Sequence, residues 1–210
     1  TGTVIFEKNA DERREVASIT KLMTALLVLE ALDRDEIALT DSVQISPRAA
    51  AMKGSQALLD ASAVYPLEDL LRTTIMASAN DSAVALSEYI AGSEENFVDR
   101  MNRRAAELGM TNTNYVNCTG YPQSGQYTTA RDVCRLCCEI AKHPRYNQYA
   151  SVWIDKLTHP GGRVTDLTNT NRLVRFYEGC DGYKTGSTDA AKYCLAATAE
   201  KNGMRLVAIV

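Results

Sequence analysis

Ser18 and Lys21 are a serine and a lysine three residues apart, at the head of a strongly apolar segment. A serine hydroxyl is a poor nucleophile at neutral pH and needs a base beside it. Residues three apart on a helix share a face, so the amine of Lys21 can lie beside the hydroxyl of Ser18. Burial, together with a second cation at Lys184, would lower the pKa of Lys21 and leave its amine neutral. The pair therefore predicts acyl transfer, with Ser18 as nucleophile and Lys21 as general base.

A second group of polar side chains, Ser78 and Asn80, lies in the sequence Ser78-Ala79-Asn80. Ser78 has a hydroxyl that can relay a proton to a departing amine, so we count it as a candidate catalytic residue. Asn80 has an amide that can bind a substrate carbonyl and could also hold Lys21 in place. These two residues are expected to form the wall of the site opposite the third motif.

The third motif is Lys184-Thr185-Gly186, followed by Ser187. A lysine cation and a threonine hydroxyl suit a terminal carboxylate. Gly186 has no side chain, so a substrate backbone can lie against this strand as an added strand. The N–H groups of Ser18 and Ser187 are expected to form an oxyanion hole. All four residues of this strand are therefore candidate substrate-binding residues.

The elements that must position these motifs follow from apolar periodicity. The segment 18–32 predicts a helix that is apolar on most sides, and such a helix is buried on most sides. Residues 33–66 indicate short strands and loops, with a turn at Ser46-Pro47. Further helices are predicted at 67–76, 81–91, 94–108 and 129–142, with the break Ser78-Ala79-Asn80 between the first two.

The second half of the chain is rich in extended segments. Strands are predicted at 151–158, 163–168, 179–186, 192–200 and 204–210, in addition to a first strand at 3–8. Asn202-Gly203 is a favoured hairpin turn, so the last three strands can form an antiparallel meander, and the first can join its edge. The expected fold class is α/β, with an antiparallel sheet flanked by helices and a mostly helical block.

Length and composition set the expected organisation and partners. The 210 residues carry a net charge of -3 and are 45% hydrophobic, which favours a globular domain and gives no reason to expect nucleic acid. We expect a single catalytic domain over 1–210, with the helical block at about 33–145 and the sheet from 1–10 and 179–210. No apolar run approaches the roughly 18 residues of a membrane span.

Histidines and cysteines do not form an alternative site in the sequence. His143 and His159 each precede a proline and indicate loop or cap positions, which argues against a zinc site or a histidine-based triad. Of the six cysteines, Cys134 and Cys137 form a C-x-x-C inside a predicted helix, with no second pair at zinc-finger spacing. We therefore expect small, buried thiols rather than a redox or metal pair.

The three motifs occur in the order S-x-x-K, S-x-N and K-T-G, which is the set found in penicillin-binding proteins and serine β-lactamases. Almost the whole chain also resembles low-molecular-mass D-alanyl-D-alanine carboxypeptidases of serine peptidase family S11. The stretches that carry the resemblance are A-S-I-T-K-L-M-T-A at 17–25, M-A-S-A-N-D-S-A at 76–83, E-L-G-M at 107–110, D-G-Y-K-T-G at 181–186 and G-M-R-L at 203–206.

The resemblance implies a penicillin-binding fold and a bacterial hydrolase of peptidoglycan biosynthesis with a role in cell shape. Such an enzyme removes the terminal D-alanine from the stem pentapeptide through an acyl-serine intermediate, and β-lactam antibiotics acylate it. No metal or organic cofactor is implied. The implied location is extracytoplasmic, for a secreted protein at the cell wall or the outer face of the cytoplasmic membrane. We expect a trimmed chain, with peripheral membrane association through an anchor outside these residues.

Two positions depart from the family pattern. Many relatives have His or Tyr after K-T-G, where this chain has Ser187. Many also have an arginine between two asparagines, in a stretch that here is Asn169-Thr170-Asn171, with Arg172 displaced by two positions. Carboxylate recognition is therefore expected to differ in this chain.

Three other functions compete with this interpretation. A class A β-lactamase needs a loop glutamate for deacylation, but residues 143–172 contain only two acids, Asp155 and Asp166. An endopeptidase would cut cross-linked dimers and leave pentapeptide monomers intact. A non-enzymatic cell-wall binding module would have lost the nucleophile or the base, whereas both Ser18 and Lys21 are present.

Overall fold

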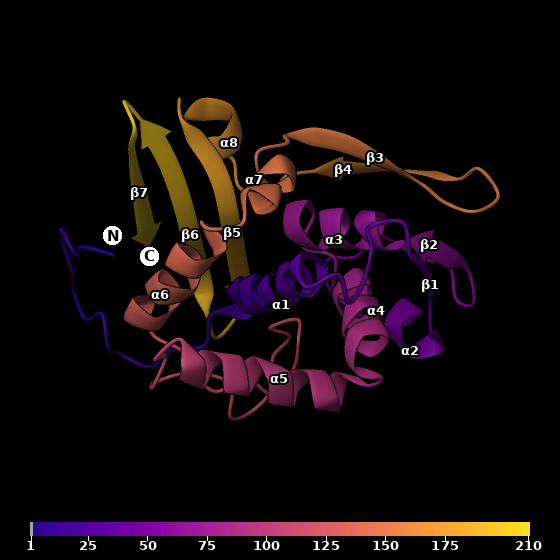
Figure 1. Cartoon of the computed structure of the whole chain (residues 1–210), viewed down its shortest axis with the longest axis horizontal. Helices are drawn as coiled ribbons and strands as arrows, with labels where there is room; N and C mark the ends of the chain where they lie inside the picture. Colours follow the sequence, from indigo (N-terminus) through magenta and orange to yellow (C-terminus); the bar gives the residue numbers. More distant parts are fainter. Residues whose placement is uncertain (1) are drawn as a thin grey trace.

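A buried helix, α1 (Lys21–Asp33), runs through the centre of the computed structural model, which describes residues 2–210. Ten of its side chains are buried and they point in all directions around the axis, as the unbroken apolar composition predicts. Figure 1 shows α1 between a sheet on one side and a group of helices on the other. A 3₁₀ turn, Ala17–Thr20, leads into α1 and carries Ser18.

Four predicted helices are confirmed and form the helical block. They are α3 (Leu67–Met76), α4 (Asn80–Ala91), α5 (Glu94–Glu107) and α6 (Ala130–Ile140). Two of them begin at a side-chain cap, because the hydroxyl of Ser93 accepts the N–H of Asn96 and that of Thr129 accepts the N–H of Asp132. The break between α3 and α4 is held by Ser78, whose φ of 62° lies in the left-handed region.

The main sheet is an antiparallel meander of β5 (Cys180–Thr188), β6 (Lys192–Lys201) and β7 (Met204–Ile209). The turn between β6 and β7 is the predicted one, since Asn202 and Gly203 have φ values of 53° and 74°. Two positive φ values in succession are what a type I′ hairpin turn requires. The predicted α/β class, with an antiparallel sheet flanked by helices, is confirmed.

Two small antiparallel pairs complete the strands. One joins β1 (Ser42–Gln44) to β2 (Val64–Pro66), and the other is a hairpin of β3 (Ile154–Thr158) and β4 (Val164–Thr168). Figure 1 shows this hairpin extending beyond α3, away from the main sheet. The predicted turn at Ser46-Pro47 is instead the start of a short helix, α2 (Pro47–Ala50), because the hydroxyl of Ser46 caps the N–H of Ala49.

The prediction of a first strand at 3–8, and hence of a sheet that includes part of 1–10, is wrong. Residues 3–8 form no strand, and Val4, Ile5 and Phe6 are exposed. Strand propensity describes how well a side chain fits a half-buried pleated surface. A segment with high strand propensity therefore forms no strand unless it pairs with a partner strand. Figure 1 shows this segment as an irregular trace beside β7.

Two further short helices were not expected from the sequence. They are α7 (Pro144–Ala150), which lies between α6 and β3, and α8 (Leu173–Phe176), which precedes β5. Both are shorter than two full turns, so apolar periodicity gives little signal for them. Proline is a favoured first residue of a helix, so Pro144 at the start of α7 could have indicated this helix.

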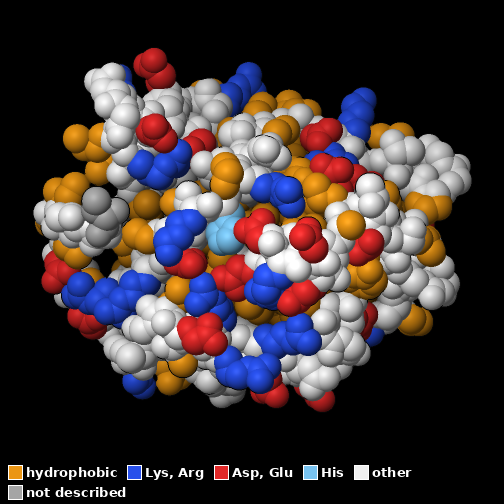
Figure 2. Space-filling view, viewed as in Figure 1, with side chains coloured by type: hydrophobic (Ala, Val, Ile, Leu, Met, Phe, Trp, Pro, Cys, Tyr) orange, Lys and Arg blue, Asp and Glu red, His pale blue; other side chains and the backbone are white. Residues whose placement is uncertain are grey.

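The surface carries both signs of charge in alternation. Figure 2 shows lysines and arginines interspersed with aspartates and glutamates over the face that it draws. Among residues 2–210, no helix has both the length and the apolar run that a membrane crossing requires.

Candidate active site

Ser18 and Lys21 meet at the junction of the 3₁₀ turn and α1. The amine Nζ of Lys21 donates hydrogen bonds to Oγ of Ser18 at 2.9 Å and to the carbonyl oxygen of Thr119 at 2.7 Å. The side chain of Lys21 is 1% exposed, whereas Ser18 is only half-buried. The structure thus gives the serine hydroxyl a close, water-shielded amine and leaves the hydroxyl itself accessible.

The amine of Lys21 is suited to act as a base. Burial lowers the pKa of Lys21 to about 7, although the nearby Cys118 and Asp81 act in the opposite direction. The predicted cause, burial, is confirmed as the main one. The sequence predicted that the charge of Lys184 would lower the pKa of Lys21, but the charge of Lys21 acts on Lys184 instead. Burial, and then this charge, place the pKa of Lys184 well below its usual range.

Strand β5 packs directly against the turn that carries the serine. A Cβ on Gly186 would lie 2.5 Å from the carbonyl oxygen of Val16 and 3.1 Å from the backbone nitrogen of Ser18. Contacts this close exclude any side chain at Gly186 without a backbone shift. The glycine of the third motif is therefore needed to bring the strand edge to the serine.

The remaining polar groups of this strand lie at the same edge. Lys184 is buried, and its Nζ donates to the carbonyl oxygen of Thr185 at 3.0 Å. The Oγ1 of Thr185 donates to Oγ1 of Thr170 at 2.7 Å, so two hydroxyls stand side by side. Arg172 is exposed and forms no ion pair within residues 2–210. The hydroxyl of Thr170 thus lies beside that of Thr185.

Two buried asparagines fix the position of Thr170. The Nδ2 of Asn169 donates to the carbonyl oxygens of Ala150 and Val152, both at 2.8 Å. The Oδ1 of Asn171 accepts the N–H of Leu173 at 3.1 Å. The exposed Thr170 between them is consequently presented on a well-anchored turn.

Ser78 and Asn80 come from the break between α3 and α4. Both are buried, and the charge of Asp81, next to Asn80, raises the pKa of Lys21 against the effect of burial. The Nδ2 of Asn80 donates to the carbonyl oxygen of Lys53 at 2.5 Å. The suggestion that Asn80 holds Lys21 is therefore not supported, because the amine bonds to Ser18 and Thr119 instead.

The side chain of Asn80 still has unused hydrogen-bonding capacity. Its Oδ1 is buried and has no partner among the described residues. Its Nδ2 has a second hydrogen beyond the one given to Lys53. Since a buried polar atom without a partner is costly, this amide is suited to receive both the N–H and the carbonyl of a bound peptide unit.

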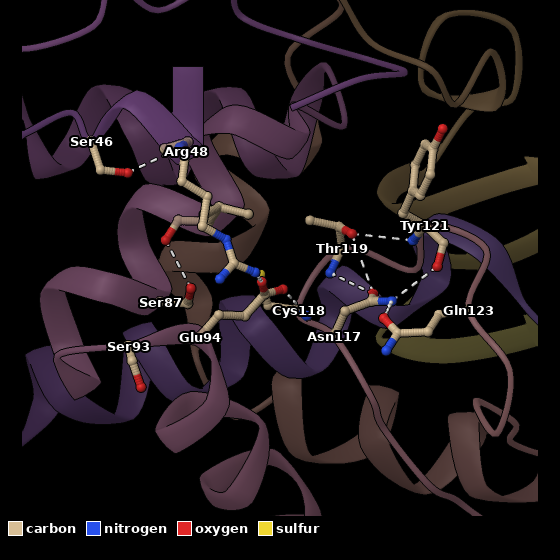
Figure 3. A network of polar contacts seen from close by, with 12 residues as sticks. Ser46, Arg48, Ser87, Ser93, Glu94, Asn117, Cys118, Thr119, Tyr121 and Gln123 are labelled. Carbon is tan, nitrogen blue, oxygen red and sulfur yellow. Dashed lines mark hydrogen bonds and ion pairs between the residues drawn. The ribbon is translucent and has the colours of Figure 1, made fainter. Parts of the chain in front are cut away.

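Sequence reasoning missed a loop that orients the base. We call residues 117–123 the Asn117 loop. The Oδ1 of Asn117 accepts the N–H of Thr119 at 3.2 Å and that of Gly120 at 2.7 Å, and its Nδ2 donates to the carbonyl oxygen of Tyr121 at 2.9 Å. Figure 3 shows this asparagine at the centre of the turn. The turn presents the carbonyl of Thr119 to the amine of Lys21.

The same loop is tied to the helical block. The carboxylate of Glu94 accepts the N–H of Cys118 at 3.0 Å and pairs with Arg48, and the carbonyl oxygen of Cys118 accepts the hydroxyl of Thr24 at 2.6 Å. Figure 3 shows this second cluster beside the first. The loop lies about a hundred residues from Lys21 in sequence, so only a run of turn-forming residues, N-C-T-G, could have indicated it.

No histidine or cysteine side chain among residues 2–210 hydrogen-bonds to Ser18 or Lys21. Cys118 and Cys137 are buried, the other four cysteines are half-buried, and all six are free thiols. His143 is the cap residue of α7, as expected. His159 is buried in the turn of the β3–β4 hairpin, where its Nδ1 lies 2.7 Å from the hydroxyl of Tyr65.

The two acids weighed for a β-lactamase also lie elsewhere. Asp155 is on β3 and pairs with Arg72, while Asp166 on β4 has an 80% exposed side chain that faces Lys156. Neither carboxylate hydrogen-bonds to Ser18 or Lys21. No acid of the segment 143–172 is therefore in place to activate a water at the acylated serine.

An antiparallel sheet packed on a buried helix that carries a bonded serine and lysine defines the architecture of penicillin-binding proteins. The solved D-alanyl-D-alanine carboxypeptidase DacD from Francisella tularensis superimposes with a TM-score of 0.95 at 30% identity, covering 100% of this chain and 62% of that one. Penicillin binding protein 5 from Haemophilus influenzae superimposes with a TM-score of 0.93 at 33% identity, covering 99% of this chain and 61% of that one.

The family follows from the sequence match. Residues 1–210 match the family Peptidase_S11, D-alanyl-D-alanine carboxypeptidase, and the chain belongs to this family. It is 43% identical over 210 residues to the D-alanyl-D-alanine carboxypeptidase DacF of Bacillus subtilis, covering 100% of this chain and 54% of that protein. It is 36% identical to DacC of Escherichia coli, covering 53% of that protein. The chain thus spans about half the length of these relatives.

Proposed function

We propose that this chain is the catalytic domain of a serine-type D-alanyl-D-alanine carboxypeptidase, which hydrolyses the terminal D-alanine from peptidoglycan stem pentapeptides. The observation that carries this proposal is the 2.9 Å hydrogen bond from the amine of Lys21 to the hydroxyl of Ser18. The pKa of that amine, about 7, allows a neutral fraction at physiological pH. The relatives named for this activity, which match along the whole of this chain, support it.

The acylation step uses the serine and lysine together. The Oγ of Ser18 attacks the carbonyl carbon of the penultimate D-alanine while the neutral Nζ of Lys21 takes the hydroxyl proton. The N–H groups of Ser18 and Ser187 would stabilise the negative charge that forms on the carbonyl oxygen. As the peptide bond breaks, the proton passes through the hydroxyl of Ser78 to the departing amine of the terminal D-alanine. The acyl-serine remains, and Lys21 is neutral again.

Deacylation can reuse the same base. The neutral amine of Lys21 takes a proton from a water that attacks the acyl carbonyl, and this proton returns to Oγ of Ser18 as the ester bond breaks. β-Lactams enter the first step in the same way, because Ser18 opens their strained amide. No metal or organic cofactor is needed for either step.

The strand edge supplies carboxylate recognition. Lys184 and the hydroxyl of Thr185 would bind the terminal carboxylate, with the hydroxyl of Thr170 as a second donor in place of the arginine found in many relatives. In the free protein, burial and the charge of Lys21 lower the pKa of Lys184. An arriving carboxylate favours protonated Lys184, and that cation in turn disfavours a protonated Lys21. Substrate binding would therefore leave Lys21 in the basic form.

A carboxypeptidase of this kind would act outside the cytoplasmic membrane, where peptidoglycan lies, and would be a target of β-lactam antibiotics. We infer that residues 1–210 act as one catalytic unit. Membrane association and a role in cell shape would depend on segments outside these residues.

Mass spectrometry after incubation with a stem pentapeptide and, separately, with benzylpenicillin tests the proposal. We expect release of one alanine from the peptide and a single penicilloyl adduct on the protein, and neither with Ser18→Ala. Cleavage of cross-linked dimers without action on the pentapeptide would replace the proposal with an endopeptidase. Rapid turnover of a chromogenic cephalosporin would replace it with a β-lactamase, and absence of any adduct would indicate a non-enzymatic module.

A further inference from the structure

Tyr121 is an exposed aromatic residue on the Asn117 loop, and the proposed mechanism makes no use of it. Its side chain is 43% exposed, and its hydroxyl has no hydrogen-bond partner within residues 2–210. Figure 3 shows the ring pointing away from the polar network that holds its backbone. The ring therefore contributes little to the stability of the loop that presents it.

The backbone of Tyr121 is held on both sides. Its N–H donates to Oγ1 of Thr119 at 3.1 Å, and its carbonyl oxygen accepts Nδ2 of Asn117 at 2.9 Å. The same Nδ2 also donates to Oε1 of Gln123 at 3.2 Å. The backbone that carries this side chain is pre-organised, so contact with a ligand costs the loop little conformational entropy.

The ring of Tyr121 lies beside the wall of the active site. Cε2 of Tyr121 is 3.9 Å, and Nδ2 of Asn80 is 2.8 Å, from the point where a Cβ on Gly54 would stand. The ring and the Asn80 amide thus flank the same glycine. Two residues before Tyr121, the carbonyl of Thr119 accepts the amine of Lys21 at 2.7 Å. The ring is consequently a neighbour of the proposed substrate-binding amide, and it stands on the loop that bonds to the base.

The position of Tyr121 relative to the substrate follows from the direction in which the substrate would lie across the site. The hydroxyls of Thr185 and Thr170 lie together on the side that would take the terminal carboxylate. Asn80 would bind the peptide unit on the other side of the scissile bond, which is the acyl side. Since Tyr121 flanks Gly54 with Asn80, groups that meet the ring belong to the acyl donor.

We infer that Tyr121 forms an apolar subsite that contacts an aliphatic or aromatic group on the acyl side of the substrate. This inference rests on the proposed function and deepens it by naming a specificity-determining residue. An aromatic ring packs against such a group by offset or edge-on contact. Gly54 leaves room for the Tyr121 ring and the Asn80 amide to lie on either side of it, because a side chain at this position would collide with the amide.

A pair of β-lactams that differ only in the acyl arm tests the inference. Benzylpenicillin carries an arylacetyl group, whereas 6-aminopenicillanic acid has a bare amine at that position. We expect Tyr121→Ala to slow acylation by benzylpenicillin about 5-fold, as a lost aromatic contact does, while acylation by 6-aminopenicillanic acid changes less than 2-fold. Tyr121→Phe keeps the ring and should retain the wild-type ratio of the two rates.

A control variant separates the local effect from a general one. Tyr89 is 41% exposed, bonds to Asp41 at 3.0 Å and lies near the far end of α4, so Tyr89→Ala should leave the ratio unchanged. Equal slowing of both penicillins by Tyr121→Ala, or no slowing of either, would overturn the inference. If the wild-type protein reacts with neither compound, the proposed function itself fails, and that result is distinct from a failure of the subsite.

Discussion

At the scale of single residues, the site depends on the protonation state of one buried amine. The amine of Lys21 bonds to the nucleophile and to a backbone carbonyl, and burial lowers the pKa of Lys21 to about 7. The hydroxyl of Ser18 needs no such adjustment, because geometry alone presents it. Acylation should therefore respond to pH through the neutral fraction of Lys21.

Acylation by benzylpenicillin should become faster as pH rises from 6 to 8, because the neutral form of Lys21 is the active one and its pKa is about 7. Lys21→Arg should lower the rate constant at pH 7.5 by at least about 100-fold, which is the smallest loss typical of a removed general base. Stopped-flow or quenched adduct formation across this pH range measures both effects. A flat profile together with near-normal acylation of the variant would assign the base to another group.

At the scale of elements, the site exists because a strand and a helical turn approach each other at backbone contact distance. Strand β5 meets the turn Ala17–Thr20 at Gly186, whose missing side chain leaves room for the carbonyl of Val16. The wall from α3 and α4 and the Asn117 loop then close the other sides. Small shifts of β5 should therefore affect chemistry more than they affect folding.

Gly186→Ala tests this contact, since its Cβ would lie 2.5 Å from the carbonyl oxygen of Val16. We expect a loss of about 1–3 kcal/mol in the free energy of unfolding, as overpacking typically costs. Acylation should fall by more than about 10-fold, because the strand edge and the serine must separate. Urea denaturation and the rate of penicillin adduct formation give the two values.

Gly162→Ala is the matched control. Its φ of 89° makes alanine strained there, but a Cβ would meet nothing within 4 Å, and the glycine lies in the β3–β4 turn. A similar loss of stability with unchanged acylation is expected. If the two variants lose activity equally, the close approach at Gly186 is not what positions the site.

At the scale of the whole molecule, buried polar clusters connect parts that lie far apart in sequence. His159 in the β3–β4 turn is 2% exposed, with Nδ1 at 2.7 Å from the hydroxyl of Tyr65 on β2 and Nε2 at 2.8 Å from Oγ1 of Thr165. The guanidinium of Arg163 lies 3.0 Å from the same Nδ1, and the carboxylate of Asp60 lies 3.7 Å from it. This cluster joins the hairpin to the helical block.

The His159 cluster should make stability depend on pH. Burial, and then the charge of Arg163, lower the pKa of His159 below 6.5, although Asp60 and Asp81 act in the opposite direction. The unfolded chain therefore binds a proton that the folded chain resists, and stability that is present above about pH 6.5 is lost as pH falls below it. Urea midpoints at pH 7.5 and 5.5 should differ less in His159→Gln than in the wild type.

His143→Gln is the control, since His143 is at the start of α7, with Nδ1 at 2.7 Å from the carboxylate of Asp33. It should not flatten the pH dependence as His159→Gln does. An unchanged difference between the two midpoints in His159→Gln would show that the cluster does not carry the effect.

The sequence by itself determined the features that depend on neighbouring residues. Ser18 and Lys21 are three apart, so a helical turn brings them together whatever surrounds them. The same holds for the Asn202-Gly203 turn and for the helices α3, α4, α5 and α6, whose apolar periodicity lies within one segment. The three motifs, together with the longer stretches that resemble family S11, were also sufficient to indicate the family, which the comparisons confirmed.

Tertiary structure alone decided the contacts between segments far apart in the chain. Thr119 accepts a hydrogen bond from Lys21 across 98 residues, and the hydroxyl of Thr170 accepts one from Thr185. The segment 3–8 has the composition of a strand but pairs with nothing. Pairing and close approach depend on which surfaces meet when the core packs, and local propensity carries no information about distant surfaces.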